Sequence, residues 1–154
     1  MQQLIITPFV GIGEIRFGLR EDALMQLLGE PDEIMEDEFT DQSISRSLEY
    51  QSLGLQLILD SEDGYRLTTI TATNQTTTIN DIAPVGKTEE ELKALADALG
   101  VTDLVLDDEL SDLGSKDYYS DSKGLSFWIV DELVDSVSMF PAYEEDGETI
   151  IWPD

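Results

Sequence analysis

Apolar and polar positions follow two different periods along the first half of this chain. Over residues 21–28 the apolar positions follow helical spacing, acidic residues occupy the first turn, and Gly29 follows. Residues 55–59 then alternate strictly, as in a strand with one buried face, and Asp63-Gly64 is typical of a tight hairpin turn. The pattern therefore predicts a short helix followed by antiparallel strands.

The second half shows the same succession. Thr88 and Glu91 form a capping-box sequence at the start of a helix that we expect to end at Gly100. Residues 125–130 alternate again, and we expect the chain to turn near 131–132 into a further strand. Other strands are expected around the remaining apolar positions Ile34, Leu48, Tyr50, Val105, Tyr118 and Tyr119.

The two halves also correspond residue by residue. Gly18, Leu24, Leu27 and Leu28 return 68 residues later as Gly86, Leu92, Leu95 and Ala96. Internal similarity at such a period indicates a duplicated supersecondary unit. We therefore predict an α+β fold of two tandem copies, each a short helix followed by about four antiparallel strands, with the helices on one face of the sheet layer. The copies cover about residues 1–75 and 76–154 of a single globular domain spanning 1–154.

Both predicted helices are too short and too one-sided to be stable alone, so we expect them to lie on the sheet and to leave its other face open. The period of two places mostly small polar residues and one tryptophan on that open face: Gln56, Ile58, Thr69, Thr71, Ser126, Trp128, Ser136 and Ser138. A tryptophan on a polar surface is typical of a side chain that anchors an interface. The alternative is that Trp128 packs under a loop or against the other copy.

The charge of the chain is strongly unbalanced, with 34 acidic and 8 basic residues and a net charge of -26. Such a charge repels the phosphates of nucleic acids and anionic membrane surfaces, so we expect neither as a partner. Complementary charge speeds the association of proteins, which makes a basic protein the expected partner. The alternative is that the acidity only keeps the protein soluble or adapts it to a salt-rich environment.

Two residue types used in catalysis are absent from the sequence, which has no cysteine and no histidine. Thiolate chemistry is thereby excluded, and so is the commonest general base near neutral pH. The acidic run at residues 60–64 lacks the glycine and glutamate positions of an EF-hand loop. We therefore expect no catalytic residue, no metal site and no cofactor, and we predict that the protein is not an enzyme.

The N-terminal residues lack the basic start and apolar stretch of a secretion signal. No run of about 18 apolar residues occurs anywhere in the sequence. These features predict a cytoplasmic protein, which we expect to be a monomer or a weak dimer.

Two acidic runs follow the two predicted helices at corresponding places. They are Glu36, Asp37 and Glu38 in the first half and Asp107, Asp108 and Glu109 in the second. If a pseudo-twofold axis relates the halves, both runs lie near one edge and form an acidic patch for the partner. Three aromatic residues are the expected anchors inside this acidic rim: Tyr118, Tyr119 and Trp128.

The succession Gly18-x5-Leu24-x2-Leu27-Leu28-Gly29-x-Pro31, followed by strands and duplicated, resembles the helix-plus-sheet unit of the β-lactamase inhibitory protein and of the related outer-membrane assembly lipoprotein fold. The chain also resembles the small acidic immunity proteins that neutralise bacterial polymorphic toxins. In the inhibitor, the curved sheet face of the tandem repeat grips the target. The resemblance thus implies an immunity or inhibitor-type protein that neutralises a basic partner, such as a toxin.

Two other functions are compatible with the sequence. One is a small-ligand-binding protein or a hydrolase that uses carboxylates in the crevice between the copies, which requires a deep pocket with converging acids. The other is an accessory structural subunit, which requires an exposed apolar patch near the C-terminus at Phe140, Ile150, Ile151 and Trp152.

Overall fold

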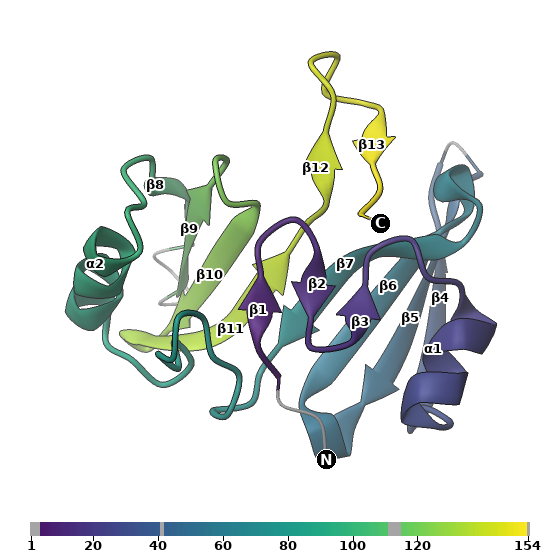
Figure 1. Ribbon diagram of the computed structural model, residues 1–154, viewed down its shortest axis with the longest axis horizontal. Helices are drawn as coiled ribbons and strands as arrows, with labels where there is room; N and C mark the ends of the chain where they lie inside the picture. The colour runs from purple at the N-terminus through teal and green to yellow at the C-terminus, as the bar shows by residue number, and fades with distance from the viewer. Residues whose placement is uncertain (1–3, 41, 111–114, 154) are drawn as a thin grey trace.

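Short strands near both ends of the chain flank a large sheet (Figure 1). The computed structural model describes residues 4–40, 42–110 and 115–153, apart from the side chains of 107–110. Near the N-terminus three strands form a small antiparallel sheet: β1 (Ile6–Thr7), β2 (Gly11–Ile12) and β3 (Ile15–Arg16). Near the C-terminus a two-stranded sheet consists of β12 (Ala142–Tyr143) and β13 (Ile150–Ile151).

The centre of the fold is one eight-stranded antiparallel sheet in the order β4-β5-β6-β7-β11-β10-β9-β8. Helix α1 (Glu21–Leu28) precedes the first four of these strands, β4 (Glu33–Glu38), β5 (Ile44–Tyr50), β6 (Leu55–Asp60) and β7 (Arg66–Ala72). Helix α2 (Glu89–Ala98) precedes the other four, β8 (Val105–Leu110), β9 (Ser115–Ser120), β10 (Leu125–Val130) and β11 (Leu133–Met139). The short 3-10 helix η1 (Gln51–Leu53) connects β5 to β6, and η2 (Ser61–Asp63) connects β6 to β7.

Strands β7 and β11, which are far apart in the sequence, join the two four-stranded parts. Thr71 lies directly opposite Ser138 in this pair, and the two hydroxyl oxygens are 2.9 Å apart. On either side of them, the paired side chains are buried: Ala72 with Val137 and Ile70 with Met139. The junction is therefore a continuous part of the sheet and of its core.

The predicted fold class is wrong. Strands occupy 46% and helices only 17% of the structure, so the protein is mostly β and not α+β. In place of two helix-plus-four-strand copies there is a single large sheet, and β1, β2, β3, β12 and β13 lie outside it. The periodicity of a sequence reports local elements, whereas the pairing of β7 with β11 is a contact between distant segments that no local pattern encodes.

Two local predictions are confirmed. At the start of α2, the Thr88 side chain accepts a hydrogen bond from the Glu91 backbone N–H, and the Glu91 carboxylate accepts one from the Thr88 backbone N–H. At the predicted hairpin turn, Gly64 follows η2 with a φ of 69°, a left-handed conformation that glycine adopts without a steric cost. Within the part of the chain that the structure describes, no helix is long and apolar enough to cross a membrane.

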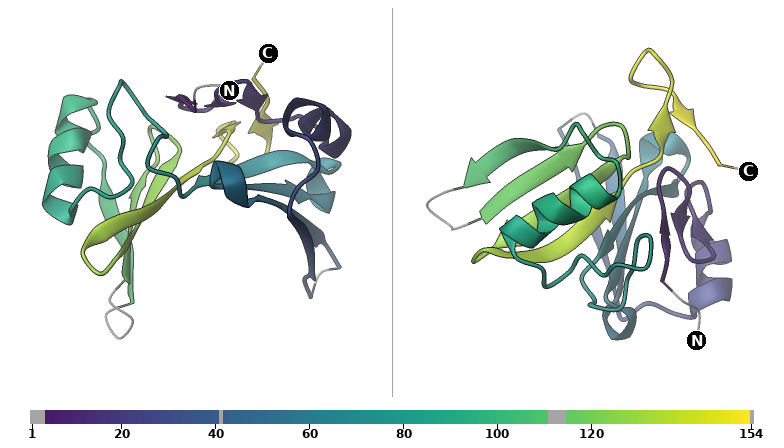
Figure 2. Two further views of the ribbon diagram at one scale, coloured as in Figure 1. Left: turned by 90° about the horizontal axis from the view of Figure 1, so that it is seen from below. Right: turned by 60° about the vertical axis from the view of Figure 1, so that its left-hand side comes forward.

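The large sheet is arched, and α1, α2 and the N-terminal strands lie on its convex side, which we call the outer face (Figure 2). Alternate strand residues such as Leu57 and Phe127 are buried in one cluster with Leu24 of α1 and Leu92 of α2. Burying these apolar side chains is the main favourable term in folding. The hydrophobic core therefore lies between the outer face and the segments that cover it.

Candidate interaction surface

The concave side of the sheet, which we call the inner face, carries neither helix (Figure 2). Residues paired between neighbouring strands point to the same side of a sheet, so the register identifies this face. One row of paired residues crosses all eight strands and is called the central row: Glu33, Glu49, Gln56, Thr71, Ser138, Ser126, Tyr119 and Val105. The flanking row comprises Met35, Ser47, Ile58 and Thr69 in one half and Asp117, Trp128 and Ser136 in the other.

These two rows contain every residue that was expected on the open face of the sheet: Gln56, Ile58, Thr69, Thr71, Ser126, Trp128, Ser136 and Ser138. Most of them are partly exposed, although Ser136 is buried. The alternation of strand residues was enough to select them, because a period of two divides a strand between its two faces.

Hydrogen bonds hold polar side chains of the inner face in place. The Gln56 Nε2 atom donates to Glu49 Oε1 at 2.8 Å, and the Ser126 hydroxyl donates to the Asp117 carboxylate. The Thr71 and Ser138 hydroxyls form the third bond of this set, at the junction of the two halves. Side chains that are already ordered lose less conformational freedom when a partner binds, so this surface is pre-organised.

The described residues of the central and flanking rows include carboxylates but no lysine or arginine. Glu33 lies directly opposite Glu49, and like charges in such a pair are destabilising. Arg46 and Lys116, which precede Ser47 and Asp117 of the flanking row, point to the outer face instead. There Arg46 pairs with Glu21 and Glu36, and Lys116 pairs with Glu89. The charge of the inner face is therefore negative along these rows.

Apolar side chains border the central row in both halves. Trp128 is partly exposed and lies between Asp117 and Ser136 in the flanking row. In the other half the same row contains Ile58, which is partly exposed, and Met35, which is 41% exposed. Aromatic residues and methionine are enriched at protein interfaces, so this mixture suits contact with another protein.

The structure separates the two tyrosines that were expected to act together with Trp128. Tyr118 is only 7% exposed, its hydroxyl donates to Glu89, and the Lys93 Nζ atom lies 5.8 Å from its ring centre, all on the outer side. Tyr119 is partly exposed and lies opposite Ser126, on the same face as Trp128. Consecutive strand residues point to opposite sides, so only Tyr119 and Trp128 share the expected surface.

The two acidic runs do not meet at one edge, contrary to the prediction. Glu36, Asp37 and Glu38 belong to β4, whereas Asp107, Asp108 and Glu109 belong to β8, at the opposite edge of the sheet. The reason is the junction: when two four-stranded parts join through their last strands, their first strands are farthest apart. In β4, Glu36 is 2.8 Å from Arg46, while Asp37 lies opposite Ser45. The side chains of 107–109 lie outside the described residues.

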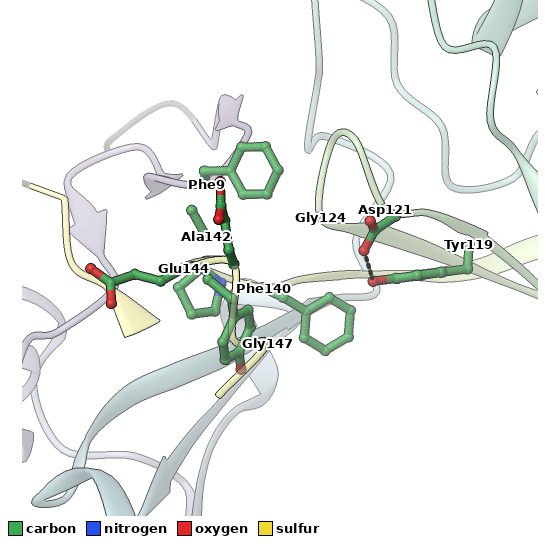
Figure 3. Close-up of a pocket in the computed structure, with 11 residues that line it drawn as sticks. Phe9, Tyr119, Asp121, Gly124, Phe140, Ala142, Glu144 and Gly147 are labelled. Carbon is green, nitrogen blue, oxygen red and sulfur yellow. Dashed lines mark hydrogen bonds between the residues drawn. The ribbon is translucent and has the colours of Figure 1, made fainter. Parts of the chain in front are cut away.

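A pocket that the sequence did not predict shares Tyr119 with the central row (Figure 3). Its volume is about 560 Å³, and we call it the aromatic pocket because four rings line it: Phe9, Tyr119, Phe140 and Tyr143. The Tyr119 hydroxyl donates to Asp121 at 3.0 Å; burial first, and this bond second, raise the pKa of Tyr119. Local patterns could not reveal the pocket, because its lining comes from three segments distant in the sequence.

Buried or clustered acidic residues and the C-terminal apolar residues bear on the two alternative functions. No group of three or more acidic side chains that could hold a metal ion occurs among the described residues. Burial and then the neighbouring Asp60 raise the pKa of Asp63, but both residues belong to the β6–β7 turn region and neither lines the aromatic pocket. Of the expected C-terminal apolar patch, Ile151 is 48% exposed, while Trp152 packs against the core with Arg66 5.3 Å above its ring.

Comparisons of the chain with protein-family models, curated proteins and solved structures found no match. The resemblance suggested by the sequence motif therefore stays a prediction.

Proposed function

We propose that this protein is a non-catalytic binding module whose inner face holds a basic partner protein. The observation that carries the proposal is the central row, which is continuous across eight strands and presents Glu33 and Glu49 but no described lysine or arginine. Seven strand spacings of about 4.8 Å give this row a width of about 34 Å. A typical interface of about 800 Å² per partner is about 28 Å on a side, so the face is wide enough.

The chemistry of the surface supports the same partner. Ordered Gln, Ser and Thr side chains supply hydrogen bonds, and Trp128 and Tyr119 supply partly exposed aromatic anchors. A net charge of -26 attracts a basic protein over a distance and raises the association rate. The resemblance to inhibitory and immunity proteins supports a neutralising role, with a toxin-like partner bound in the cytoplasm by a monomer or weak dimer.

The experiment is retention of proteins from an extract of the source cell on the immobilised protein, at low and at high salt. We expect one protein of high isoelectric point to be retained at low salt and released at high salt, because screening shortens the reach of surface charge. The double variant Trp128→Ala/Glu49→Gln should lose this retention. It changes one aromatic anchor and one carboxylate of the inner face.

The matched control is Leu27→Ala/Glu30→Gln, which removes one exposed apolar side chain and one exposed carboxylate around the end of α1. This control should retain the same protein as the unmodified chain. Retention of no specific basic protein would count against the proposal, and so would an equal loss in the two double variants.

A further inference from the structure

The aromatic pocket is built where three distant segments are held together. The Phe140 backbone N–H donates to the Gly124 carbonyl at 2.9 Å, and Phe9 forms an isolated parallel β-bridge with Pro141. A Cβ atom at Gly124 would lie 2.7 Å from Phe9 Cε1, so the Phe9 ring packs directly against the β9–β10 turn. Phe9 itself has a φ of 67°, which is strained for a bulky residue.

The rings of the pocket are accessible. Phe9, Tyr119 and Phe140 are partly exposed, and Tyr143 is 46% exposed. Figure 3 shows Phe9 and Phe140 on different sides of the pocket and the Tyr119 hydroxyl directed toward it, next to Asp121. The face of an aromatic ring carries negative charge and attracts a cation within about 6 Å of its centre.

Three acidic residues line the pocket together with these rings. Asp121 lies in the β9–β10 turn, and Glu144 and Glu145 follow β12; all three are exposed and line the pocket. None of the described residues that line it is a lysine or an arginine. The pocket therefore combines two features that favour a cation, namely ring faces and negative charge, and contains no cation of its own.

We propose that the aromatic pocket binds an arginine side chain of the basic partner protein. An arginine fits better than a lysine, because its planar guanidinium stacks on ring faces and donates several hydrogen bonds to carboxylates, whereas the ammonium group is compact and strongly hydrated. The pocket adjoins the inner face through Tyr119, so one partner could reach both. This inference rests on the proposed function for the identity of the ligand as a protein side chain.

The test is a titration of ¹⁵N-labelled protein with N-acetyl-arginine amide at low salt, followed by amide chemical shifts. We expect saturable shifts of the Gly124 and Gly147 amides, which belong to the pocket lining. N-acetyl-citrulline amide has nearly the same shape without the charge and should bind at least about threefold more weakly, as should N-acetyl-lysine amide. Equal binding of citrulline or lysine, or shifts spread over the surface, would overturn the proposal.

Variants separate the two contributions to binding. Phe140→Leu keeps an apolar side chain and removes one ring, and should weaken arginine binding at least about twofold, while Phe140→Tyr restores it. The triple variant Asp121→Asn/Glu144→Gln/Glu145→Gln should weaken it at least about fivefold. A control triple variant, Glu30→Gln/Glu90→Gln/Asp97→Asn, removes the same charge from exposed positions outside the pocket and should have a smaller effect. Equal weakening by the two triple variants would refute a specific site.

The titration also distinguishes this inference from the proposed function. Trp128→Ala lies outside the pocket lining and should leave the affinity for N-acetyl-arginine amide unchanged, whereas its combination with Glu49→Gln should abolish retention of the partner. Loss of arginine binding in the pocket variants without loss in Trp128→Ala supports the pocket independently of the inner face. If Trp128→Ala weakens arginine binding as much as the pocket variants do, the ligand lies on the inner face and the pocket proposal is wrong.

Discussion

Helices α1 and α2 make the same kind of contact with the sheet but are stabilised in different ways. Each begins with a glutamate that pairs with a basic residue of the sheet, Glu21 with Arg46 and Glu89 with Lys116. Only α2 has a local cap, formed by Thr88 and Glu91. At the N-cap of α1 stands Arg20, whose side chain makes no capping hydrogen bond.

The other end of α1 is also held by the sheet. The Tyr50 hydroxyl of β5 donates to the Gly29 carbonyl, which follows the last turn of the helix, at 2.9 Å. Helix α1 therefore depends on side chains from distant strands at both ends, whereas α2 stabilises its own first turn. Short helices are marginal alone, so we expect α1 to form only together with the sheet.

The largest loss of stability is expected when a buried leucine of either helix is replaced, because packing on the core contributes more than capping does. Leu24 and Leu92 are both 0% exposed, and replacing either by alanine should lower the free energy of unfolding by about 2–5 kcal/mol. Urea denaturation measures this loss. Leu27→Ala, at a position that is 38% exposed, is the control and should cost less than about 1 kcal/mol. Costs below this control value for both buried positions would show that the helices are not part of the core.

Substitutions at the N-caps should have an intermediate effect on stability and should distinguish the two helices. Thr88→Ala should lower the free energy of unfolding by about 1 kcal/mol, because the Glu91 backbone N–H loses its acceptor. Arg20→Ala, at the matching position of α1, should change it by less than about 0.5 kcal/mol, since no cap is lost. Similar losses in both variants, measured by urea denaturation, would contradict the contrast between the helices.

The ion pairs should differ by a smaller amount. Arg46→Met removes the partner of two carboxylates and should lower the free energy of unfolding by about 1 kcal/mol. Lys116→Met removes the partner of one carboxylate and should lower it by about 0.5 kcal/mol. Both costs should shrink in 1 M salt, where charges are screened within about 3 Å. Costs that do not change between low and high salt would indicate packing rather than charge.

The smallest effect depends on pH. The hydrogen bond from the Tyr118 hydroxyl, followed by Lys116, lowers the pKa of Glu89 below its usual value. Ionised Glu89 therefore adds stability above the pKa of the unfolded chain, near 4.5, and this stability is lost as the pH falls through the lower folded-state pKa. Glu89→Gln should destabilise the protein at pH 7 by about 0.5 kcal/mol and by less at pH 3. Urea titrations of both proteins at the two pH values provide the check, and an equal difference at both values would be inconsistent with it.

Elements that neighbouring residues specify could be predicted, and both helices are among them. The capping box of α2 and the turn at Gly64 depend on residues within four positions of each other, so their sequences sufficed. The inner face was predictable because alternation assigns Gln56 and Trp128 to one side of their strands. Alternation also separates Tyr118 from Tyr119, but a pair of neighbouring tyrosines does not show which of them faces the core.

The local sequence pattern therefore sufficed to predict the helices, turns and strand faces, because each depends on neighbouring residues and on a period of 3.6 or 2. The single eight-stranded sheet and the place of the acidic runs depended on the pairing of β7 with β11, which puts β4 and β8 at opposite edges. The aromatic pocket likewise needed Phe9, Tyr119 and Phe140 to meet in space. Contacts between distant residues form only when the whole chain folds, since the entropy of closing long loops is recovered through burial of the shared core.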